Sequence, residues 1–275
     1  MPHKVIFLDV DGTLTEPGAM QHPPSACRAM EAARANGHRL VLCSGRSEEL
    51  LTPLLVYPFD AVVSSAGARI TCGGELLYDR SISPPLLERT TGLLARSGVE
   101  YTLECRDTSY SSPGFTDLLL RCAARGSNSE LARWARHARE DPVLTVASYP
   151  GTPVYKITFA SPDARRLESP FRLLESDFYC CVMGTDQFGV VNGELIQRSF
   201  SKGTAVRTLC RYWGIPIADS VAFGDSMNDA AMLEAAGLGI CMGNGDPQLK
   251  AMADEVCLPH DQDGLAAAFH SHGWA

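Results

Sequence analysis

Short apolar segments alternate with helical patterns over the first part of the chain. Residues 4–9 form a mostly apolar run that ends in a carboxylate, which is typical of a strand buried on both faces of a parallel sheet. Residues 25–36 carry apolar or small side chains at helical spacing, and Asn36-Gly37 is a helix-ending signal. A second apolar strand at 39–43 follows at once. This order predicts a βαβ unit.

The same alternation continues and returns near the end of the chain, so we expect one sheet built from both ends of the sequence. In the first part the pattern predicts a helix at 47–55, a strand at 61–64 and a hairpin at 69–78 that turns at Gly73-Gly74. In the last part it predicts a helix at 202–213, a strand at 220–224, a helix from 228, a strand at 237–242 and two short further elements.

The middle of the chain has a different texture, because turn-rich stretches separate helices from short strands. We interpret it as an inserted α+β module. The predicted class is therefore α/β, with a Rossmann-like doubly wound parallel sheet core formed by 1–82 plus 188–275 and an inserted α+β domain at 83–187. Within the insert we expect helices near 86–97, 129–139 and 163–174 and strands near 99–104, 117–121, 155–159 and 178–183.

Composition and charge narrow the range of partners. A length of 275 residues is compatible with one large domain or two unequal ones. A net charge of −8 and a pI near 5.4 provide no basic patch for nucleic acid or anionic lipid, so we expect neither partner. The apolar runs are too short for a signal peptide or a membrane span, and the ten cysteines include no C-x-x-C pair. We expect a cytoplasmic protein of undetermined oligomeric state.

Carboxylates follow the first predicted strand, in the motif Asp9-Val-Asp-Gly-Thr13. In open parallel sheets the ligand site lies beyond the carboxyl ends of the strands. Asp9 and Asp11 are two residues apart on a turn loosened by Gly12, so one can serve as nucleophile and the other as proton donor or base. A carboxylate attacks a phosphate only if a cation reduces the repulsion, so this interpretation requires a metal. An ordinary Asp-Gly turn is the alternative.

Two further junctions between strand and helix carry groups suited to an anion. Ser44-Gly45-Arg46 follows the strand at 39–43, and its hydroxyl and N–H groups can bind a phosphate oxygen, although a simple helix cap has the same pattern. Lys202 opens a predicted helix, where the helix dipole disfavours a cation. That placement suggests a partner anion, and a solvated surface lysine is the alternative.

The last junction is Gly224-Asp-Ser-Met-Asn-Asp229, after the strand at 220–224. Asp225 and Asp229 can ligate a hard cation there, and Asn228 can donate to a ligand. An acidic helix cap would look the same. Four such motifs, in order and each at a strand–helix junction, are together an improbable coincidence.

The four motifs resemble those of the haloacid dehalogenase superfamily, and more narrowly its Cof-type phosphatases with a type IIB cap. The family motif D-x-D-G-T matches Asp9 to Thr13, and G-D-x-x-N-D matches Gly224 to Asp229. The family's second-motif hydroxyl and third-motif lysine match Ser44 and Lys202, and its A-M-G-N segment resembles residues 241–244. The chain departs from the family at Ala66, where relatives usually carry Asn, so the substrate contacts usual there are in doubt.

The resemblance implies a Mg²⁺-dependent phosphatase that acts on a small phosphorylated metabolite. Sugar phosphates are the default substrate class, and phosphorylated cofactors such as pyridoxal or flavin phosphates are the alternative. Asp9 would form the aspartyl-phosphate while Asp11 acts as acid and base. Mg²⁺ would bind the carboxylates of Asp9 and Asp225 and the backbone carbonyl of Asp11. Further roles would fall to Asp229 (positioning a metal-bound water or the lysine), to Lys202 and Ser44 (phosphoryl charge), and to N–H groups near Gly45.

The resemblance leaves two other functions open and points to the insert for specificity. A phosphotransferase or phosphomutase would use the same aspartyl-phosphate, and a non-catalytic metabolite sensor would keep the fold without turnover. The insert occupies the place of the family's cap, which closes over the leaving group. Its candidate specificity residues are Arg106, Tyr110, Tyr149 and Lys156.

Overall fold

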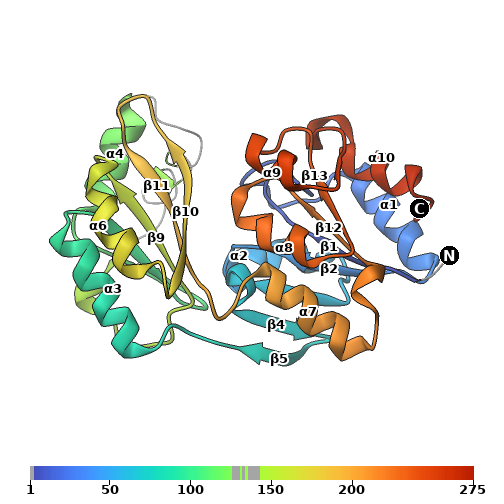
Figure 1. The fold of residues 1–275 in the computed structure, drawn as a ribbon, viewed down its shortest axis with the longest axis horizontal. Helices are drawn as coiled ribbons and strands as arrows, with labels where there is room; N and C mark the ends of the chain where they lie inside the picture. The colour runs from blue at the N-terminus through green and yellow to red at the C-terminus, as the bar shows by residue number, and fades with distance from the viewer. Residues whose placement is uncertain (1–2, 126–130, 132–133, 136–142) are drawn as a thin grey trace. The chain divides into compact units, whose positions relative to one another are not determined.

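The computed structural model describes residues 3–125, 131, 134–135 and 143–275, which divide into two compact units (Figure 1). The first unit combines Met1–Asp79 with Phe200–Ala275, and the second is the continuous segment Arg80–Ser199. The second unit is thus an insertion between the two halves of the first.

The central strand of the first unit is β1 (Val5–Leu8), which pairs in parallel with β2 (Arg39–Cys43) on one side and β12 (Ser220–Gly224) on the other. All four residues of β1 are buried. The apolar run predicted this, because a strand covered on both faces needs no polar side. One sheet therefore contains strands from both ends of the chain, and the predicted α/β class is confirmed.

The remaining strands extend this sheet to the order β14-β13-β12-β1-β2-β3-β4-β5 in the described residues. The outer strands comprise three parallel ones and an antiparallel edge hairpin: β3 (Ala61–Ser64), β13 (Leu238–Cys241) and β14 (Glu255–Val256), then β4 (Arg69–Cys72) and β5 (Glu75–Asp79).

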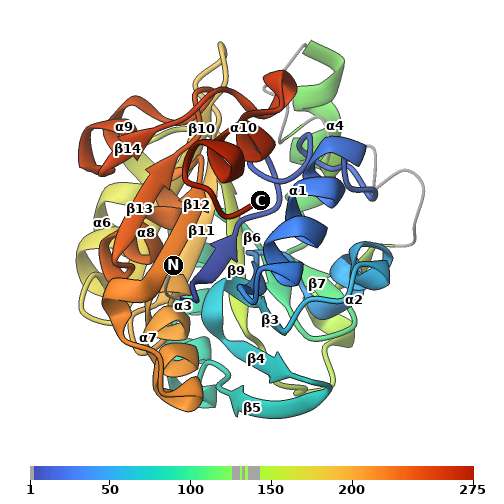
Figure 2. The same cartoon turned by 90° about the vertical axis from the view of Figure 1, so that its right-hand side faces the viewer.

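Helices cover both faces of this sheet (Figure 2). On one face α1 (Pro24–Ala35) and α10 (Gly264–Ser271) pack on alternate residues of β1, and on the other face α7 (Lys202–Trp213) and α8 (Ala230–Ala235) pack on the rest. Two hydrophobic cores result, one on each side of the sheet. The arrangement is the predicted doubly wound one.

Shorter elements join these parts. The helix predicted at 47–55 is divided into α2 (Glu48–Leu51) and the 3₁₀ segment η1 (Thr52–Val56), because Pro53 has no N–H to continue an α-helix. The others are η2 (Ser65–Gly67), η4 (Ile217–Asp219), η5 (Met227–Asp229), α9 (Pro247–Met252) and η6 (His260–Gln262).

The second unit has a sheet of its own, with the strand order β10-β11-β9-β6-β7-β8 in the described residues. Helices α3 (Pro84–Arg96) and α6 (Arg165–Leu174) cover one face of it, and their buried leucines share a core with the strands (Figure 1). This is the predicted α+β composition. The strands are β6 (Glu100–Glu104), β7 (Ser109–Ser111), β8 (Leu144–Thr145), β9 (Lys156–Ser161), β10 (Phe178–Thr185) and β11 (Val191–Gln197), and η3 (Val146–Ser148) follows β8.

One predicted strand of the insert is wrong. Residues 117–121 lie inside the helix α4 (Phe115–Arg125). The run of three leucines suggests a buried strand, but the buried side chains Phe115, Leu118, Leu119 and Cys122 follow helical spacing. The pattern over the whole of residues 115–125 therefore predicts the helix, because only this longer stretch contains a complete apolar helix face.

The return to the first unit occurs later than the predicted residue 188. Strand β11 pairs with both β9 and β10, so it belongs to the sheet of the second unit, and the first unit resumes only at Phe200. The sequence prediction missed β11 as a strand of the insert. Much of the helix predicted at 129–139 lies outside the described residues.

A strained turn follows β3. Ser65 (φ 49°) and Ala66 (φ 57°) both adopt left-handed backbone conformations, which cost non-glycine residues about 1–2 kcal/mol each. Their N–H groups donate to the carbonyls of Arg46 (2.8 Å) and Ser44 (2.9 Å). At the next position a Cβ on Gly67 would lie 2.3 Å from the backbone of Ser201. The turn thus holds the segment after β2 close to the start of α7.

We expect Ala66→Gly to raise the free energy of unfolding by about 0.5–1 kcal/mol, because relief of the left-handed strain exceeds the added chain entropy of glycine. Ala68→Gly is the control: Ala68 has φ −69°, so glycine there should lower the free energy of unfolding by about 0.5–1 kcal/mol. Urea unfolding of both variants measures the difference. A loss of stability in both would contradict the strain.

Candidate active site

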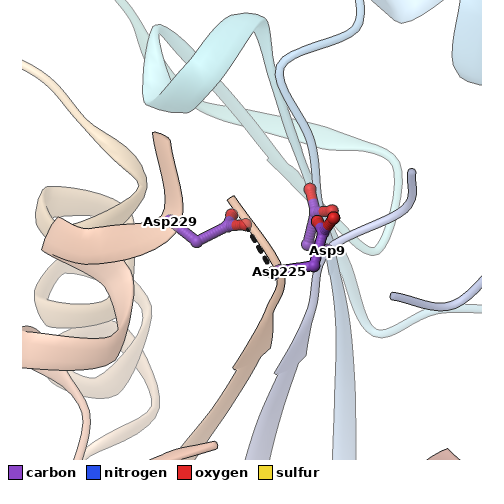
Figure 3. Close-up of side chains that lie close together, drawn as sticks. All are labelled: Asp9, Asp225 and Asp229. Atoms are coloured by element: carbon purple, nitrogen blue, oxygen red, sulfur yellow. Dashed lines mark hydrogen bonds between the residues drawn. The ribbon is translucent and has the colours of Figure 1, made fainter. Parts of the chain in front are cut away.

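Asp9 and Asp225 come together because their strands are neighbours. In the pairing of β1 with β12, Leu8 lies opposite Phe223, and the Asp9 N–H donates to the Phe223 carbonyl at 3.1 Å. Both carboxylates therefore emerge at the carboxyl edge of the sheet, where the sequence predicts them (Figure 3). Asp9 is buried and Asp225 is partly buried.

Asp229 completes a group of three carboxylates. Its side chain reaches from η5 toward the two strand ends (Figure 3), and one oxygen from each of the three residues lies within 4.8 Å of the others. Oδ2 of Asp229 accepts the N–H groups of Asp225 and Ser226, each at 3.1 Å. These two bonds fix the carboxylate, which is fully buried.

Lys202 is the cation of this group and is only 1% exposed. It is the first residue of α7, whose N-terminus is capped by a reciprocal pair of hydrogen bonds between Ser201 and Thr204. Nζ of Lys202 donates to Oδ1 of Asp9 at 2.5 Å and to Oδ1 of Asp229 at 2.6 Å. The predicted partner anion is therefore a pair of carboxylates.

Gly12 and Gly203 allow the close approach of these segments. A Cβ on Gly12 (φ 80°) would lie 2.3 Å from Oδ2 of Asp225, and a Cβ on Gly203 would lie 2.1 Å from the Ala231 carbonyl oxygen. The first glycine lets the Asp9–Asp11 turn pass beside Asp225. The second lets α7 pack on α8, which sets the position of Lys202.

Asp11 and Arg46 form a pair that the sequence did not indicate. Nε of Arg46 donates to Oδ2 of Asp11 at 2.8 Å, and Nη2 donates to Oδ1 at 2.7 Å. The Gly18 N–H also donates to Oδ1 of Asp11, at 2.6 Å. The guanidinium is buried, whereas the Asp11 side chain is 31% exposed. Its bidentate geometry is the strong form of such a pair. A phosphate contact for Arg46 stays a prediction.

The other predicted ligand-binding residues lie in loops beside these groups. Ser44 is buried, and its Oγ accepts the Arg46 N–H at 3.1 Å, so the hydroxyl caps its own turn. Gly45 lies between them. Oδ1 of Asn228 accepts the Ser226 hydroxyl at 2.8 Å. Their phosphate-binding roles stay predictions.

Two residues near the site were not singled out from the sequence. Asn244 donates to the Gly12 carbonyl at 2.8 Å and accepts the His260 N–H at 2.9 Å, so it ties the Asp9–Asp11 turn to the C-terminal segment. Thr13 is buried, and its Oγ1 has no hydrogen-bond partner in the part of the chain that the structure describes. Their places in the two recognised motifs were the available signal.

The model of the haloacid dehalogenase-like hydrolase family matches residues 6–269. The chain belongs to this family. Over 282 residues it is 28% identical to the pyridoxal phosphate phosphatase YbhA of Escherichia coli strain K12, with 99% of each protein covered. It is 29% identical over 263 residues to an HMP-PP phosphatase of Cronobacter sakazakii, with 92% of this chain and 86% of that protein covered.

Solved structures of the superfamily share the fold. BT1666 of Bacteroides thetaiotaomicron, a phosphatase of the haloalkanoate superfamily, superposes with a TM-score of 0.81 at 22% identity, over 99% of this chain and 96% of that one. The family match and the relatives named phosphatases indicate that this chain is a phosphoric monoester hydrolase. None of its described helices is both long and apolar enough to cross a bilayer.

The candidate specificity residues of the second unit have partners within that unit. Lys156 is buried and forms ion pairs with Glu194 (2.5 Å) and Glu104 (3.2 Å). Arg106 pairs with Asp107 at 2.9 Å, and the rings of Tyr110 and Tyr149 meet edge to face at 5.3 Å. Substrate recognition by these residues stays a prediction.

Burial and mutual repulsion raise the pKa values of two carboxylates in this site. Burial raises the pKa of Asp9 to about 7, with repulsion from Asp229 adding to the shift and Lys202 opposing it. Burial also raises the pKa of Asp225 to about 8, helped by repulsion from Asp9 and Asp229. Burial opposes the charge on Lys202, but Asp229 and Asp9 outweigh it and raise its pKa well above the ordinary value.

These residues fit a hard divalent cation. Three carboxylates face a single ammonium, so the fully ionised group carries an excess of two negative charges. Carboxylate oxygens are the ligands that Mg²⁺ prefers in proteins. The chemistry of the donor set, and not the family alone, supports a metal at Asp9 and Asp225.

We expect Asp225→Asn to stabilise the metal-free protein at pH 8 by about 1–3 kcal/mol. The Asp225 pKa lies near 3.8 without the fold and near 8 in it. Between these values the folded state keeps a proton that the unfolded state releases, so native stability falls as pH rises from about 4 to 8. The gain in the variant should therefore grow over that range.

Urea unfolding in chelator at several pH values measures this gain. Asp261→Asn, at an exposed carboxylate, is the matched control and should show no such pH dependence. A gain from Asp225→Asn that stays constant between pH 4 and 8 would show that the carboxyl has an ordinary pKa.

Proposed function

We propose that this haloacid dehalogenase-like hydrolase is a Mg²⁺-dependent phosphatase of small metabolites that works through an aspartyl-phosphate on Asp9. The observation that carries the proposal is the contact between Lys202 and Asp9. Lys202 donates to Oδ1 of Asp9 and favours the ionised carboxylate against the effect of burial, which leaves Oδ2 to attack. The carboxylate stands at the carboxyl edge of the sheet, where ligands of this fold class bind.

Asp9 and Asp225, with the backbone carbonyl of Asp11, would hold Mg²⁺. When bound, the ion supplies positive charge that reduces repulsion between the carboxylate and the phosphate dianion. Asp229 has a different role, because its oxygens already bind Lys202 and two backbone N–H groups. It orients the lysine and the turn that carries Asp225.

Two chemical steps follow for the side chains. In the first, Asp9 forms a bond to phosphorus, the bond to the leaving oxygen breaks, and Asp11 gives that oxygen a proton. In the second, Asp11 takes a proton from water as the water attacks phosphorus, inorganic phosphate leaves, and Asp9 is restored. Lys202 and Ser44 stabilise negative charge on the phosphoryl oxygens, and Gly45 assists through its N–H.

Asp11 must be free to reach the leaving oxygen, and its partial exposure supports this role. Arg46 orients Asp11 in the resting state through the bidentate pair. In this scheme Arg46 acts on the general acid, and a direct contact with phosphate is a second role that a substrate complex would test.

The substrate class is a phosphate monoester of a small metabolite. Sugar phosphates are the expectation from the resemblance. Two of the relatives that align over most of their length are named for pyridoxal phosphate and HMP-PP, so phosphorylated cofactors belong beside sugars in this class. The residues around Asp9 recognise the phosphoryl group, and other residues must recognise the leaving group.

We expect Asp9→Asn to abolish phosphate release while the protein stays folded, because an amide has nearly the same shape but is a far weaker nucleophile. Asp11→Asn should lower kcat by about 10²–10⁴-fold through loss of acid–base catalysis. Asp261→Asn is the matched control and should keep native activity.

The assay measures inorganic phosphate released from an aryl phosphate and from a panel of sugar phosphates and pyridoxal phosphate. Each reaction is run with Mg²⁺ and with chelator, and release should require the metal. Native activity in Asp9→Asn would falsify the aspartyl-phosphate. Release that depends on a sugar acceptor or a bisphosphate activator would identify a phosphotransferase instead.

A further inference from the structure

A short turn after β13 touches both segments that carry the candidate metal ligands. This turn, residues 243–246, lies between β13 and α9, and none of its residues takes part in the proposed reaction. Nδ2 of Asn244 donates to the Gly12 carbonyl at 2.8 Å, and the Asp246 N–H donates to the Asp225 carbonyl at 2.8 Å. The turn therefore bridges the loop after β1 and the loop after β12.

Gly245 lets the turn lie directly against the loop after β12. A Cβ on Gly245 would lie 2.6 Å from Sγ of Cys241 and 2.9 Å from the Asp225 carbonyl oxygen. The Gly245 N–H donates to the Met242 carbonyl at 2.8 Å. A side chain at this position would push the two segments apart, so the backbone contact with Asp225 depends on glycine.

The side chain of Asn244 is exposed, yet both ends of its amide have partners. Oδ1 accepts the His260 N–H at 2.9 Å, so Nδ2 is the end that faces Gly12 and donates. The preceding residue is also held, because Nζ of Lys250 donates to the Gly243 carbonyl at 2.6 Å. The amide of Asn244 thus has a fixed direction.

The carbonyl that Asn244 holds belongs to a glycine. Gly12 has φ 80°, and glycine has more accessible backbone conformations than any other residue. The Gly12 N–H donates to the Thr15 carbonyl at 2.8 Å, and its carbonyl accepts the Asn244 amide. These two contacts restrain the peptide groups on both sides of Gly12.

The peptide group between Asp11 and Gly12 carries the carbonyl proposed as a metal ligand. In a planar trans peptide the C=O and N–H point in opposite directions, so the direction of the Gly12 N–H sets that of the Asp11 carbonyl. Rotation about the backbone of Gly12 would turn this peptide group. The contact with Asn244 restrains that rotation from the other side of Gly12.

We propose that Asn244 is a positioning residue for the metal ion. Its amide holds the Gly12 carbonyl and thereby keeps the Asp11 carbonyl in place relative to Asp225. The inference rests on the proposed function, in which these groups bind Mg²⁺. Residues that orient the ligands of a metal tune the affinity for it. Mg²⁺ requires near-ideal octahedral geometry, so the placement of a single oxygen matters.

Asn244→Ala should weaken Mg²⁺ binding to the full chain by about fivefold, the scale of one neutral hydrogen bond, because the ion must then order the loop itself. Calorimetric titration with MgCl₂ measures the dissociation constant without substrate.

Asn36→Ala is the matched control. Asn36 is also exposed, and its Nδ2 donates to the Trp274 carbonyl at 3.0 Å, so this variant loses the same kind of bond in the same unit. Its affinity for Mg²⁺ should equal that of the native chain. Urea unfolding in chelator compares the stability of the two variants, because a bond with a merely structural role changes stability and leaves metal affinity unchanged.

Weaker Mg²⁺ binding in Asn244→Ala than in the control supports the inference. Equal binding in Asn244→Ala and the native chain overturns the positioning role and leaves the proposed function standing, and so does an equal loss in both variants. A native chain that binds no Mg²⁺ would overturn the metal site, and this inference with it.

Phosphate release provides a second measurement. In Asn244→Ala the Mg²⁺ concentration that gives the half-maximal rate should rise by the same factor, whereas kcat at saturating Mg²⁺ should stay close to the native value. The bound ion restores the arrangement of its own ligands, so the defect disappears at saturation. A half-maximal Mg²⁺ concentration equal to the native one would contradict the positioning role.

Discussion

The ammonium of Lys202 lies between Asp9 and Asp229, and this buried contact organises the rest of the first unit. It joins residues that are 193 and 27 positions apart in the sequence. Removing such ions from water is costly, and their attraction compensates only if the geometry is fixed. The capped start of α7, the glycine contact with α8 and the two N–H groups that hold Asp229 provide that fixed geometry.

The same group of charges makes the site reactive and also lowers the stability of the fold when no cation is bound. Burial raises the pKa values of Asp9 and Asp225, and repulsion among three carboxylates that share one ammonium adds to the shift. A fold that favoured only stability would place neutral or apolar groups there. A bound divalent cation would neutralise the excess of negative charge. The same excess favours the binding of a divalent cation.

Much of the site could be predicted because its chemistry is local in sequence. Asp9 and Asp225 each follow a strand, and a parallel sheet brings such ends together, so these two could be assigned to one place without any coordinates. Lys202 instead opens α7 after the insert, so its assignment to the site rested on the family motif. The order of strands and helices in the first unit followed from apolar periodicity in the same way.

The other features could not be predicted, because they depend on contacts between distant residues or on a sequence pattern that suits both a strand and a helix. The pairing of Asp11 with Arg46 joins residues 35 positions apart, and nothing in either motif specifies it. The three leucines of α4 suit a strand until Phe115 and Cys122 are included. Strand β11 belongs to the insert because it pairs with β9 and β10. A boundary placed from the local sequence pattern does not detect such pairing.

The position of β1 between β2 and β12 has a consequence for synthesis on the ribosome. Strand β1 is made first, yet one of its edges stays open until residues 220–224 emerge, long after the inserted unit is complete. The insert is continuous and can fold as the chain grows, whereas the first unit waits as a half-sheet with an exposed strand edge. Asp9 likewise has no lysine beside it until α7 arrives. Activity therefore appears only after α7 and β12 have been made.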